Sequence, residues 1–488
     1  MQSPTGFSQL FHHTYYLLPE LVLLAGAVLV LLVGFFARVP GVLLEILAAA
    51  TVTVALAFTL WYWPEAPHEF FYESLRVDHL SATLRVMLSG TALLILFMPM
   101  QAEGRRPEYL FFLLTIVLGG NLLVMSIDLL AVILALELIS LCSYALVGFS
   151  FSRAAAEGSW KYFLVGSAAT AITVFGMSYL FGATGETQFT SNAFLQSALG
   201  QPTTLLKVGA LLTLAGFLFK IGAAPFHWWA PDAYQSAPVA VTALLSTLPK
   251  IAGMGVFIRF TLALHLFGQG ELNWRYVLAA IALITLLVGN LGGLLQKDVR
   301  RLMAYSSIAQ SGFVLVGMAS ISLEGTQTAL FYLAVLAVMN VLTFRCLQQM
   351  AALTGTFEMA GWAGYGRQQL LLTAFLTIGV VALAGLPPTG GFMAKLFVFA
   401  SLWNGYEIHQ EPILLILFAG GLLTTVISLF FYLKAPYYLL IRPVAHTLPT
   451  KKPATGTLFT WLLVVVILTL FFYPDLLMGW LNRVTFVL

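Results

Sequence analysis

The chain is dominated by long apolar stretches that recur along its whole length. Each holds roughly 20 apolar residues, which is what a helix needs to cross the hydrocarbon core of a bilayer. About fourteen such stretches can be counted, so the pattern predicts an all-α polytopic membrane protein with about fourteen transmembrane helices. They lie at residues 15–36, 42–62, 80–100, 109–126, 128–149, 160–182, 204–223, 239–266, 276–295, 303–320, 327–350, 371–400, 413–433 and 457–480.

Composition excludes the other broad classes of protein. Residues of the set AVILMFWYC make up 60% of the chain and charged residues only 9%, whereas an average soluble domain is about 25% charged. The 23 basic and 20 acidic residues nearly balance, so we expect no nucleic-acid partner. Cys142 and Cys346 lie in apolar stretches and are predicted to pack as small apolar residues. Without Cys-x-x-Cys, paired intramembrane histidines or a Gly-rich nucleotide loop, we expect no metal or other cofactor in this chain.

Basic residues in the short loops predict the orientation. Lysine and arginine are concentrated in alternate loops, for example at residues 105–106, 297–301 and 442–452, and the intervening loop at 63–79 is acidic. Loops rich in basic residues stay in the cytoplasm. Both chain termini are therefore predicted on the non-cytoplasmic side of the membrane.

Four ionisable side chains lie well within predicted spans: Glu137, Lys220, Lys250 and Lys395. A charge at a helix centre costs roughly 2.5–3.5 kcal/mol on insertion scales, so each of these residues needs a partner, internal water or a functional path. Glu137 shares a helical face with Ser140, which indicates a polar interior rather than lipid. We interpret the four residues as a proton path; the structural alternative is ion pairs that hold helices together.

Prolines interrupt two spans close to buried lysines. Pro225 follows Lys220, and Pro387–Pro388 precede Lys395. Proline removes a backbone donor, and broken helices at membrane depth are tolerated where they line a cavity or pack within protein. His227 lies in the first interruption, and an imidazole titrates in the range that suits a proton shuttle. An ordinary hydrogen-bonded histidine is the alternative.

The interruptions also suggest an internal repeat. Spans 4–8 and 9–13 each contain five helices and one interruption, and an odd number of crossings makes the second copy enter from the opposite side. We therefore predict two inverted five-helix repeats within a single integral membrane domain. Glu20, in the first span, lies outside the repeats and is interpreted as a contact to a partner subunit. The predicted parts are residues 1–105 (three N-terminal spans), 106–268 (first repeat), 269–440 (second, inverted repeat) and 441–488 (C-terminal span).

Six stretches carry a family resemblance. They are LLPELVLLAG, ELISLCSYALVGF, FKIGAAPFHWWAPDAYQSAP, STLPKIAGMGVF, KDVRRLMAYSSIAQSGF and LAGLPPTGGFMAKLFVF. Together they resemble the subunit N family of proton-translocating NADH–quinone oxidoreductase, the antiporter-like membrane subunits of respiratory complex I. A lysine rather than a glutamate in the second broken helix is similar to subunit N and unlike subunit M.

The resemblance implies a role for each residue of the predicted path. Glu137 would pair with a lysine and modulate its proton affinity, and Lys220 would carry protons in the cytoplasmic half of the path. His227 and Lys250 would pass them on. Lys395 would release them toward the far side.

The resemblance also implies the surroundings of the chain. Lys161 matches a further family lysine near the site of proton uptake. FMN and iron–sulfur clusters would belong to partner subunits, and the quinone pool would serve the whole complex. The chain would contact other membrane-arm subunits and, through them, the peripheral NADH-oxidising arm, in the lipid bilayer of a bacterial inner membrane.

Other membrane complexes use the same kind of buried lysine. The chain is alternatively a subunit of a multi-subunit cation/proton antiporter, or of a hydrogenase or ferredoxin-coupled membrane complex. In a third alternative it is a scaffold whose ion pairs only hold the arm together. Co-purifying subunits separate the first two alternatives from complex I, and neutral substitutions test the scaffold. The sequence leaves open whether the ion is a proton or sodium.

Overall fold

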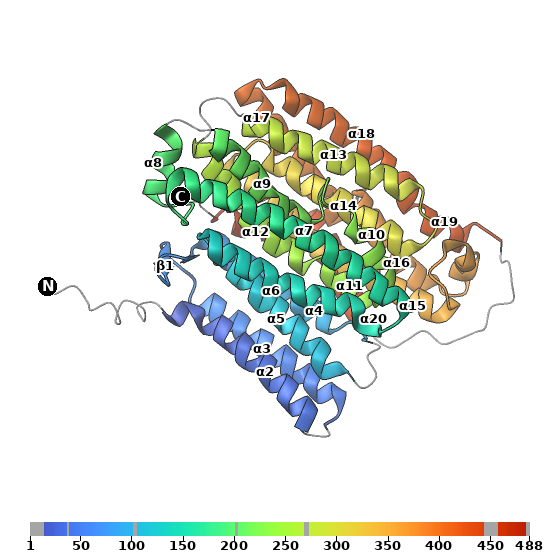
Figure 1. Ribbon diagram of the computed structural model, residues 1–488. Helices are drawn as coiled ribbons and strands as arrows, with labels where there is room; N and C mark the ends of the chain where they lie inside the picture. Colours follow the sequence, from blue (N-terminus) through green and yellow to red (C-terminus); the bar gives the residue numbers. More distant parts are fainter. Residues whose placement is uncertain are drawn as a thin grey trace.

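The computed structural model describes residues 14–36, 39–100, 105–200, 204–267, 273–443 and 457–484. In these ranges, helices run side by side through an elongated body (Figure 1). Eleven described helices are long and apolar enough to cross a membrane, and the pair Leu458–Phe472 and Asp475–Leu481 is bent by 75°. The predicted all-α, multi-pass membrane architecture is confirmed. The count of fourteen spans stays a prediction.

The N-terminal part forms three long helices and a small hairpin that the sequence did not predict. Its elements are η1 (Thr14–Leu17), α2 (Leu18–Phe36), α3 (Gly41–Trp61), β1 (His68–Phe70), β2 (Leu75–Val77) and α4 (His79–Leu96). The two strands pair antiparallel, with His68 opposite Val77. Helix α4 begins with a capping box, in which the Asp78 carboxylate accepts from the Ser81 N–H. This cap fixes the junction between the hairpin and the helix bundle.

The next part contains the first predicted interruption. Its elements are α5 (Arg106–Met125), α6 (Leu129–Val147), η2 (Gly148–Ser150), α7 (Arg153–Thr184), α8 (Asn192–Gly200), α9 (Thr204–Ile221), α10 (Trp229–Ser236), α11 (Val239–Leu245) and α12 (Leu248–Phe267). Helix α9 stops at Gly222, whose φ of +69° is left-handed and favours glycine. Pro225 follows and provides no N–H to continue the helix. The predicted break after Lys220 is confirmed.

The remaining part contains the second interruption. Its elements are α13 (Trp274–Leu294), α14 (Val299–Met318), α15 (Leu323–Thr354), η3 (Met359–Trp362), η4 (Tyr365–Arg367), α16 (Leu370–Ala384), α17 (Gly390–His409), α18 (Pro412–Tyr432), α19 (Lys434–Leu440), α20 (Thr457–Phe472) and α21 (Asp475–Leu481). Helix α16 ends at Gly385, with φ +79°, before the two prolines. Residues 371–400, predicted as one broken span, thus form α16 and the start of α17.

Two helix pairs begin and end in the same way. Asp128 caps α6 and Asp298 caps α14, each accepting from the backbone N–H groups of the first turn. The following helices, α7 and α15, are both 32 residues long, and each ends at a glycine with φ +74°, Gly185 and Gly355. The first cap lies at the end of the molecule that carries β1 and the second at the end that carries α19 (Figure 1). This arrangement supports the inverted repeat, which stays a prediction.

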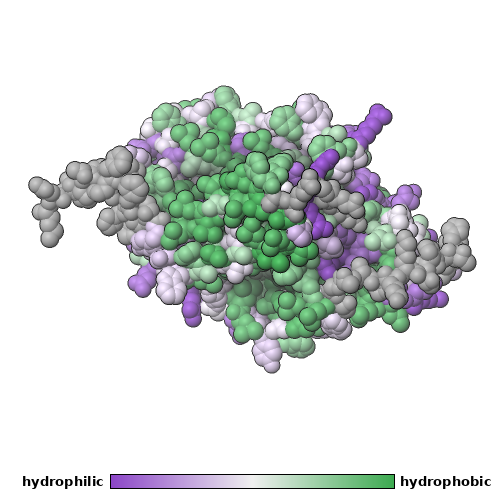
Figure 2. All heavy atoms as spheres, turned by 90° about the horizontal axis from the view of Figure 1, so that it is seen from below, coloured by the Kyte–Doolittle hydropathy of each residue, from purple (hydrophilic) through white to green (hydrophobic). Residues whose placement is uncertain are grey.

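The centre of the bundle lies around α11, α12 and α15. All of the apolar window within Val239–Leu264 is buried, whereas only 28% of the corresponding windows of Gly41–Trp61 and Pro412–Leu440 is buried. Hydrophobic side chains cover the middle of the face in Figure 2, and hydrophilic ones gather toward its two ends. Apolar side chains around the middle and polar ones at the ends are what a bilayer requires. The broken ends of α9 and α16 therefore lie inside the protein rather than against lipid.

Candidate functional site

Lys220 lies in the last turn of α9, directly before the first break. Its side chain is 2% exposed. The amine Nζ donates to Ser140 Oγ of α6 at 2.9 Å, and to the Leu136 carbonyl oxygen at 3.5 Å. Both acceptors are neutral, and no described carboxylate forms an ion pair with this amine. The sequence prediction of a buried lysine at a broken helix is confirmed.

Glu137 lies one turn before Ser140 on α6 and contacts α7. Its half-buried carboxylate accepts a hydrogen bond from Thr170 Oγ1 at 2.5 Å. The direct pair with a lysine, which the resemblance implies, is not formed between Glu137 and Lys220 in the described structure. A cavity of about 10 Å³, room for roughly one water molecule, is lined by Ser140, Thr170 and Lys220. The space lies beside the Lys220 amine, and Glu137 reaches its edge only through the Thr170 hydroxyl.

Lys250 lies in the first turn of α12 and contacts α14. It is 4% exposed, and its Nζ donates to the Ser307 carbonyl oxygen at 2.5 Å and to Ser311 Oγ at 2.7 Å. Ser311 Oγ in turn donates to the carbonyl oxygen of Ile221, the last residue of α9, at 2.6 Å. Ile221 is adjacent to Lys220. Two hydrogen bonds, through the Ser311 hydroxyl, thus connect Lys250 to the residue that follows Lys220.

Lys395 occupies the second break. It is 4% exposed, and its Nζ donates to the carbonyl oxygen of Ala384, the last residue of α16, at 2.7 Å. The same nitrogen lies 4.1 Å from the centre of the Phe313 ring of α14, which is a cation–π contact. Both interrupted spans therefore have a lysine amine beside the broken backbone.

The polar face of α14 extends from the first break to the second. Gln310 Nε2 donates to the Leu383 carbonyl oxygen and to the Tyr432 hydroxyl, both at 2.9 Å. The Tyr332 hydroxyl donates to Gln310 Oε1. Leu383 directly precedes Ala384, whose carbonyl oxygen accepts a hydrogen bond from the Lys395 amine. This polar face of α14 thus links the surroundings of the two breaks.

His227 lies in the loop between α9 and α10. It is 5% exposed, and its ring stacks on Trp228 with the centroids 4.7 Å apart. Within the described part of the chain, His227 Nδ1 has no hydrogen-bond partner. Buried ring nitrogens are ordinarily satisfied by protein or water. This nitrogen is thus placed to take a water molecule at the first break.

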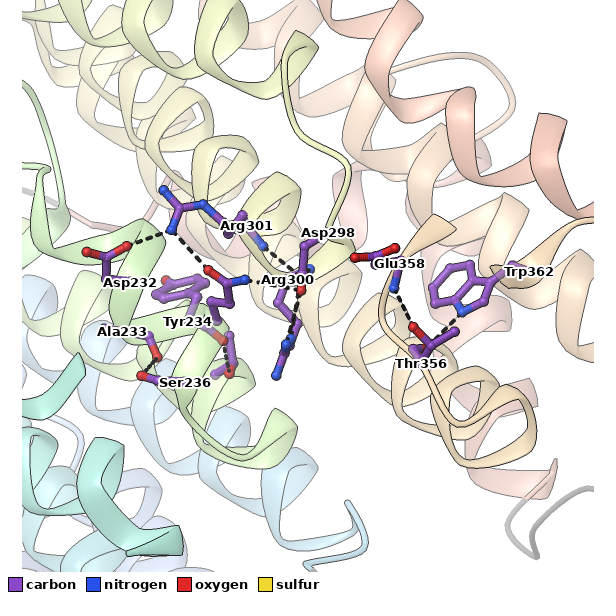
Figure 3. Close-up of polar contacts among 12 residues, drawn as sticks. Asp232, Ala233, Tyr234, Ser236, Asp298, Arg300, Arg301, Thr356, Glu358 and Trp362 are labelled. Carbon is purple, nitrogen blue, oxygen red and sulfur yellow. Dashed lines mark hydrogen bonds and ion pairs between the residues drawn. The ribbon is translucent and has the colours of Figure 1, made fainter. Parts of the chain in front are cut away.

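Lys161 lies apart from the other lysines, at the end of the bundle predicted to be cytoplasmic. It is half-exposed on α7, and its Nζ pairs with Glu157 at 2.8 Å and with Asp232 of α10 at 3.0 Å. The other Asp232 oxygen binds Arg301 of α14 at 2.6 Å (Figure 3). A cavity of about 430 Å³ is lined by Lys161, Asp232 and Arg300, among others. Asp232 thus ties α7, α10 and α14 together at the edge of this cavity.

Asp232 offers a test of this cluster. Burial raises the pKa of its carboxyl, but Lys161 and Arg301 outweigh burial and hold that pKa below its ordinary range. The carboxylate is thus ionised at neutral pH, and its contribution is lost only as acid lowers the pH through that depressed value. We expect Asp232→Asn to slow proton pumping about threefold, equally at pH 6, 7 and 8. Vesicle pumping assays check this, with exposed Asp475→Asn as the control; a deficit that changes across that range would contradict it.

Sequence reasoning missed three buried arginines within the predicted spans, Arg85, Arg259 and Arg345, of which the first two form buried ion pairs. Arg259 of α12 binds both oxygens of Asp78 at 2.6 and 2.7 Å, and Arg85 of α4 binds Glu20 at 2.7 Å. Both arginines lie inside apolar stretches, which is the signal that could have found them. The interpretation of Glu20 as a contact to a partner subunit is wrong. This carboxylate is 4% exposed and is satisfied within the chain.

Within the described ranges, no group of three or more His, Cys, Asp or Glu side chains is arranged to hold a metal ion. Cys142 and Cys346 are free and buried. Both cysteines lie among apolar side chains, so their packing role is confirmed.

Comparison with known proteins places these features in a family. Residues 126–428 match the family model described as NADH:quinone oxidoreductase/Mrp antiporter, TM. A "NADH-quinone oxidoreductase subunit N 2" of Chloroherpeton thalassium is 34% identical, over 87% of this chain and 85% of that protein. A chain of respiratory complex I from Thermus thermophilus superimposes with a TM-score of 0.79 at 27% identity, covering 95% of this chain and 99% of that one. A chain of an archaeal membrane-bound sulfane sulfur reductase shares the fold, with a TM-score of 0.84 at 21% identity and 96% of both chains covered.

Proposed function

The chain belongs to the NADH:quinone oxidoreductase/Mrp antiporter family of membrane proteins, and from this premise we propose how its buried amines carry protons. It is a proton-translocating membrane-arm subunit of NADH–quinone oxidoreductase, respiratory complex I. It is an integral multi-pass membrane protein and part of a redox enzyme. Its own task is to move protons while electron transfer occurs in other subunits.

The observation that carries the proposal is a set of three buried amines held by neutral oxygens. Lys220, Lys250 and Lys395 are 2–4% exposed and donate, within the described structure, only to hydroxyl and carbonyl oxygens. A buried charge fixed by a counterion is difficult to discharge, because removing it leaves the partner charge uncompensated. Neutral acceptors stabilise the ammonium by hydrogen bonds, and no uncompensated charge remains when the lysine loses its proton. Each lysine can therefore change its protonation state, which a proton carrier must do.

The first half of the path lies in residues 106–268. Protons enter from the cytoplasmic cavity bordered by Lys161 and reach Lys220 through the water-sized space beside Ser140. They continue to Lys250 through the first break, where His227 Nδ1 has no hydrogen-bond partner among the described residues and can therefore bind a relaying water molecule. Hydroxyls and waters relay protons because each both donates and accepts.

The second half of the path lies in residues 269–440. Protons leave Lys250 along the polar face of α14 and pass Gln310 to reach Lys395 at the second break. Release from Lys395 is on the non-cytoplasmic side. The two halves correspond to the inverted repeats, so each half-channel opens to the opposite side of the membrane.

The charge of Glu137 controls when Lys220 passes its proton on. The Glu137 carboxylate lies one turn from Ser140, which binds the Lys220 amine, and its negative charge favours the protonated form of Lys220. When the interaction between Glu137 and Lys220 weakens, Lys220 releases its proton to the next group. A proton moved against 100 mV costs about 2.3 kcal/mol, and one pKa unit is worth about 1.4 kcal/mol. Changes of about two pKa units therefore suffice to move one proton against such a field.

The assembly around the chain follows from this role. We assign FMN and the iron–sulfur clusters to partner subunits, with other membrane-arm subunits beside this chain and the peripheral NADH-oxidising arm reached through them. The quinone pool is used by the whole complex. We place the chain in a bacterial inner membrane. The distribution of basic loops puts both termini on the non-cytoplasmic side of that membrane.

Glu137→Gln tests the proposed function. The amide still accepts a hydrogen bond from Thr170, so the change removes charge and keeps shape. We expect proton pumping to fall about fivefold, since a charge interaction of about 1 kcal/mol is lost near Lys220. The measurement is the initial rate of acidification in vesicles that contain the whole complex, beside the rate of NADH oxidation. Glu407→Gln at the exposed end of α17 is the control, and unchanged pumping in Glu137→Gln would count against the proposal.

A further inference from the structure

The carboxyl end of α9 is completed by a side chain from another helix. In an uninterrupted helix, the Ile221 carbonyl would accept from the N–H of the residue four positions on, but Pro225 has no N–H. Ser311 of α14 takes that place, because its hydroxyl donates to the Ile221 carbonyl oxygen at 2.6 Å. Ser311 is 3% exposed, so this contact lies inside the protein.

The same hydroxyl is an acceptor for Lys250. Lys250 Nζ lies 2.7 Å from Ser311 Oγ. A hydroxyl has a single proton to donate and lone pairs with which to accept. While Lys250 is an ammonium, it donates to Ser311, and the hydroxyl proton goes to the Ile221 carbonyl oxygen at 2.6 Å in preference to the Ser307 carbonyl oxygen at 3.2 Å. A neutral Lys250 amine has a lone pair, so it can accept that hydroxyl proton instead.

We propose that Ser311 is a positioning residue that transmits the protonation state of Lys250 to the broken end of α9. When Lys250 carries a proton, Ser311 binds the Ile221 carbonyl. When Lys250 loses its proton, the Ser311 hydroxyl turns toward the amine and the Ile221 carbonyl is released. Only the hydroxyl rotates, and no covalent bond forms or breaks. The inference rests on the proposed proton path.

The packing around the break makes Lys220 sensitive to this change. Ile221 is adjacent to Lys220, and a Cβ built on Gly253 of α12 would lie 3.1 Å from the Lys220 stem. A Cβ built on Gly222 would lie 3.8 Å from Lys250 Nζ, so this amine lies against the left-handed turn. Release of the Ile221 carbonyl therefore removes a contact that holds the turn directly after Lys220. The end of α9 thus responds to whether Lys250 holds a proton.

Substitution of Ser311 in the whole complex tests the inference. Ser311→Ala removes one of two acceptors of the Lys250 ammonium, so we expect the alkaline limb of the pumping pH profile to move down by about one pH unit. Ser311→Thr keeps the hydroxyl and is expected to restore the profile, with Ser311→Cys intermediate. Ser428→Ala is the control, since that buried hydroxyl bonds only to its own helix. Pumping per NADH oxidised is recorded from pH 6 to 9.

Other titratable groups on the elements around Lys250 are Lys220 on α9, His227 in the loop and Tyr234, whose hydroxyl lies 3.1 Å from Ser307 Oγ. None of them contacts Ser311 in the described structure, so a shift that Ser311→Thr reverses reports on Lys250. A Ser311→Ala profile that matches Ser428→Ala, or a loss that is equal at every pH, would overturn the switch. Full pumping in Lys220→Ala would instead overturn the path itself, so the two failures are distinguishable.

Discussion

Proton pumping is expected to fall at least about tenfold when Lys220 is replaced by alanine. The substitution removes the titratable group between Ser140 and the broken end of α9, where the structure offers only neutral oxygens in its place. A hydroxyl does not bind an extra proton at neutral pH. The path therefore loses a proton-binding site, and not only a hydrogen bond. Acidification and NADH oxidation are measured together in vesicles that contain the assembled complex.

Lys220→Arg separates a proton carrier from a structural cation. Arginine keeps the positive charge and can hydrogen-bond to Ser140, but it does not release its proton in proteins. We expect this variant to assemble and still lose pumping about tenfold. Lys207→Ala, on the same helix but near its opposite end, is the matched control and is expected to pump within about twofold of the parent. Full pumping by Lys220→Arg would show that only the charge matters, as in a scaffold.

The helices were predictable because the bilayer imposes a simple rule on sequence. A span must be apolar over about 20 residues and must satisfy its own backbone, so runs such as 109–126 and 276–295 match α5 and α13 closely. The breaks at Gly222 and Gly385 followed from adjacent prolines. The hairpin at residues 68–77 was missed because two three-residue strands in an acidic loop leave no periodic pattern.

The contacts of the site were only partly predictable. Periodicity places Glu137 and Ser140 on one face of a helix, but it does not say which of them meets the lysine of the opposite helix. Packing decides that, and it brings Ser140 to Lys220 and leaves Glu137 with Thr170. Likewise, the sequence shows that Ser306, Ser307 and Ser311 lie close together on α14, but not what they contact. Their partners, on α9 and α12, depend on how helices from the two halves meet.

The buried arginines lead to the second large effect. Arg259 makes a two-pronged contact with Asp78, which also caps α4, so one carboxylate ties α4 to α12. Removing one partner of a buried ion pair leaves the other charge uncompensated, at a cost of about 3–5 kcal/mol. We therefore expect Arg259→Ala to reduce incorporation of the chain into the complex about tenfold or more. Arg367→Ala, at an exposed position, is the control, and membrane levels are compared by quantitative immunoblot.

The pH dependence of this effect has a definite sign. Burial raises the pKa of the Asp78 carboxyl, but Arg259 and the Ser81 N–H outweigh burial and lower it below its ordinary range. A carboxyl with a lowered pKa stabilises the folded chain above its unfolded-state pKa, near 4, and this contribution disappears as pH falls through the folded-state value. The difference in thermal stability between parent and Arg259→Ala should thus be larger at neutral pH than in acid. If the variant were as stable as the parent at pH 7, the Arg259–Asp78 pair would not be what holds α4 against α12.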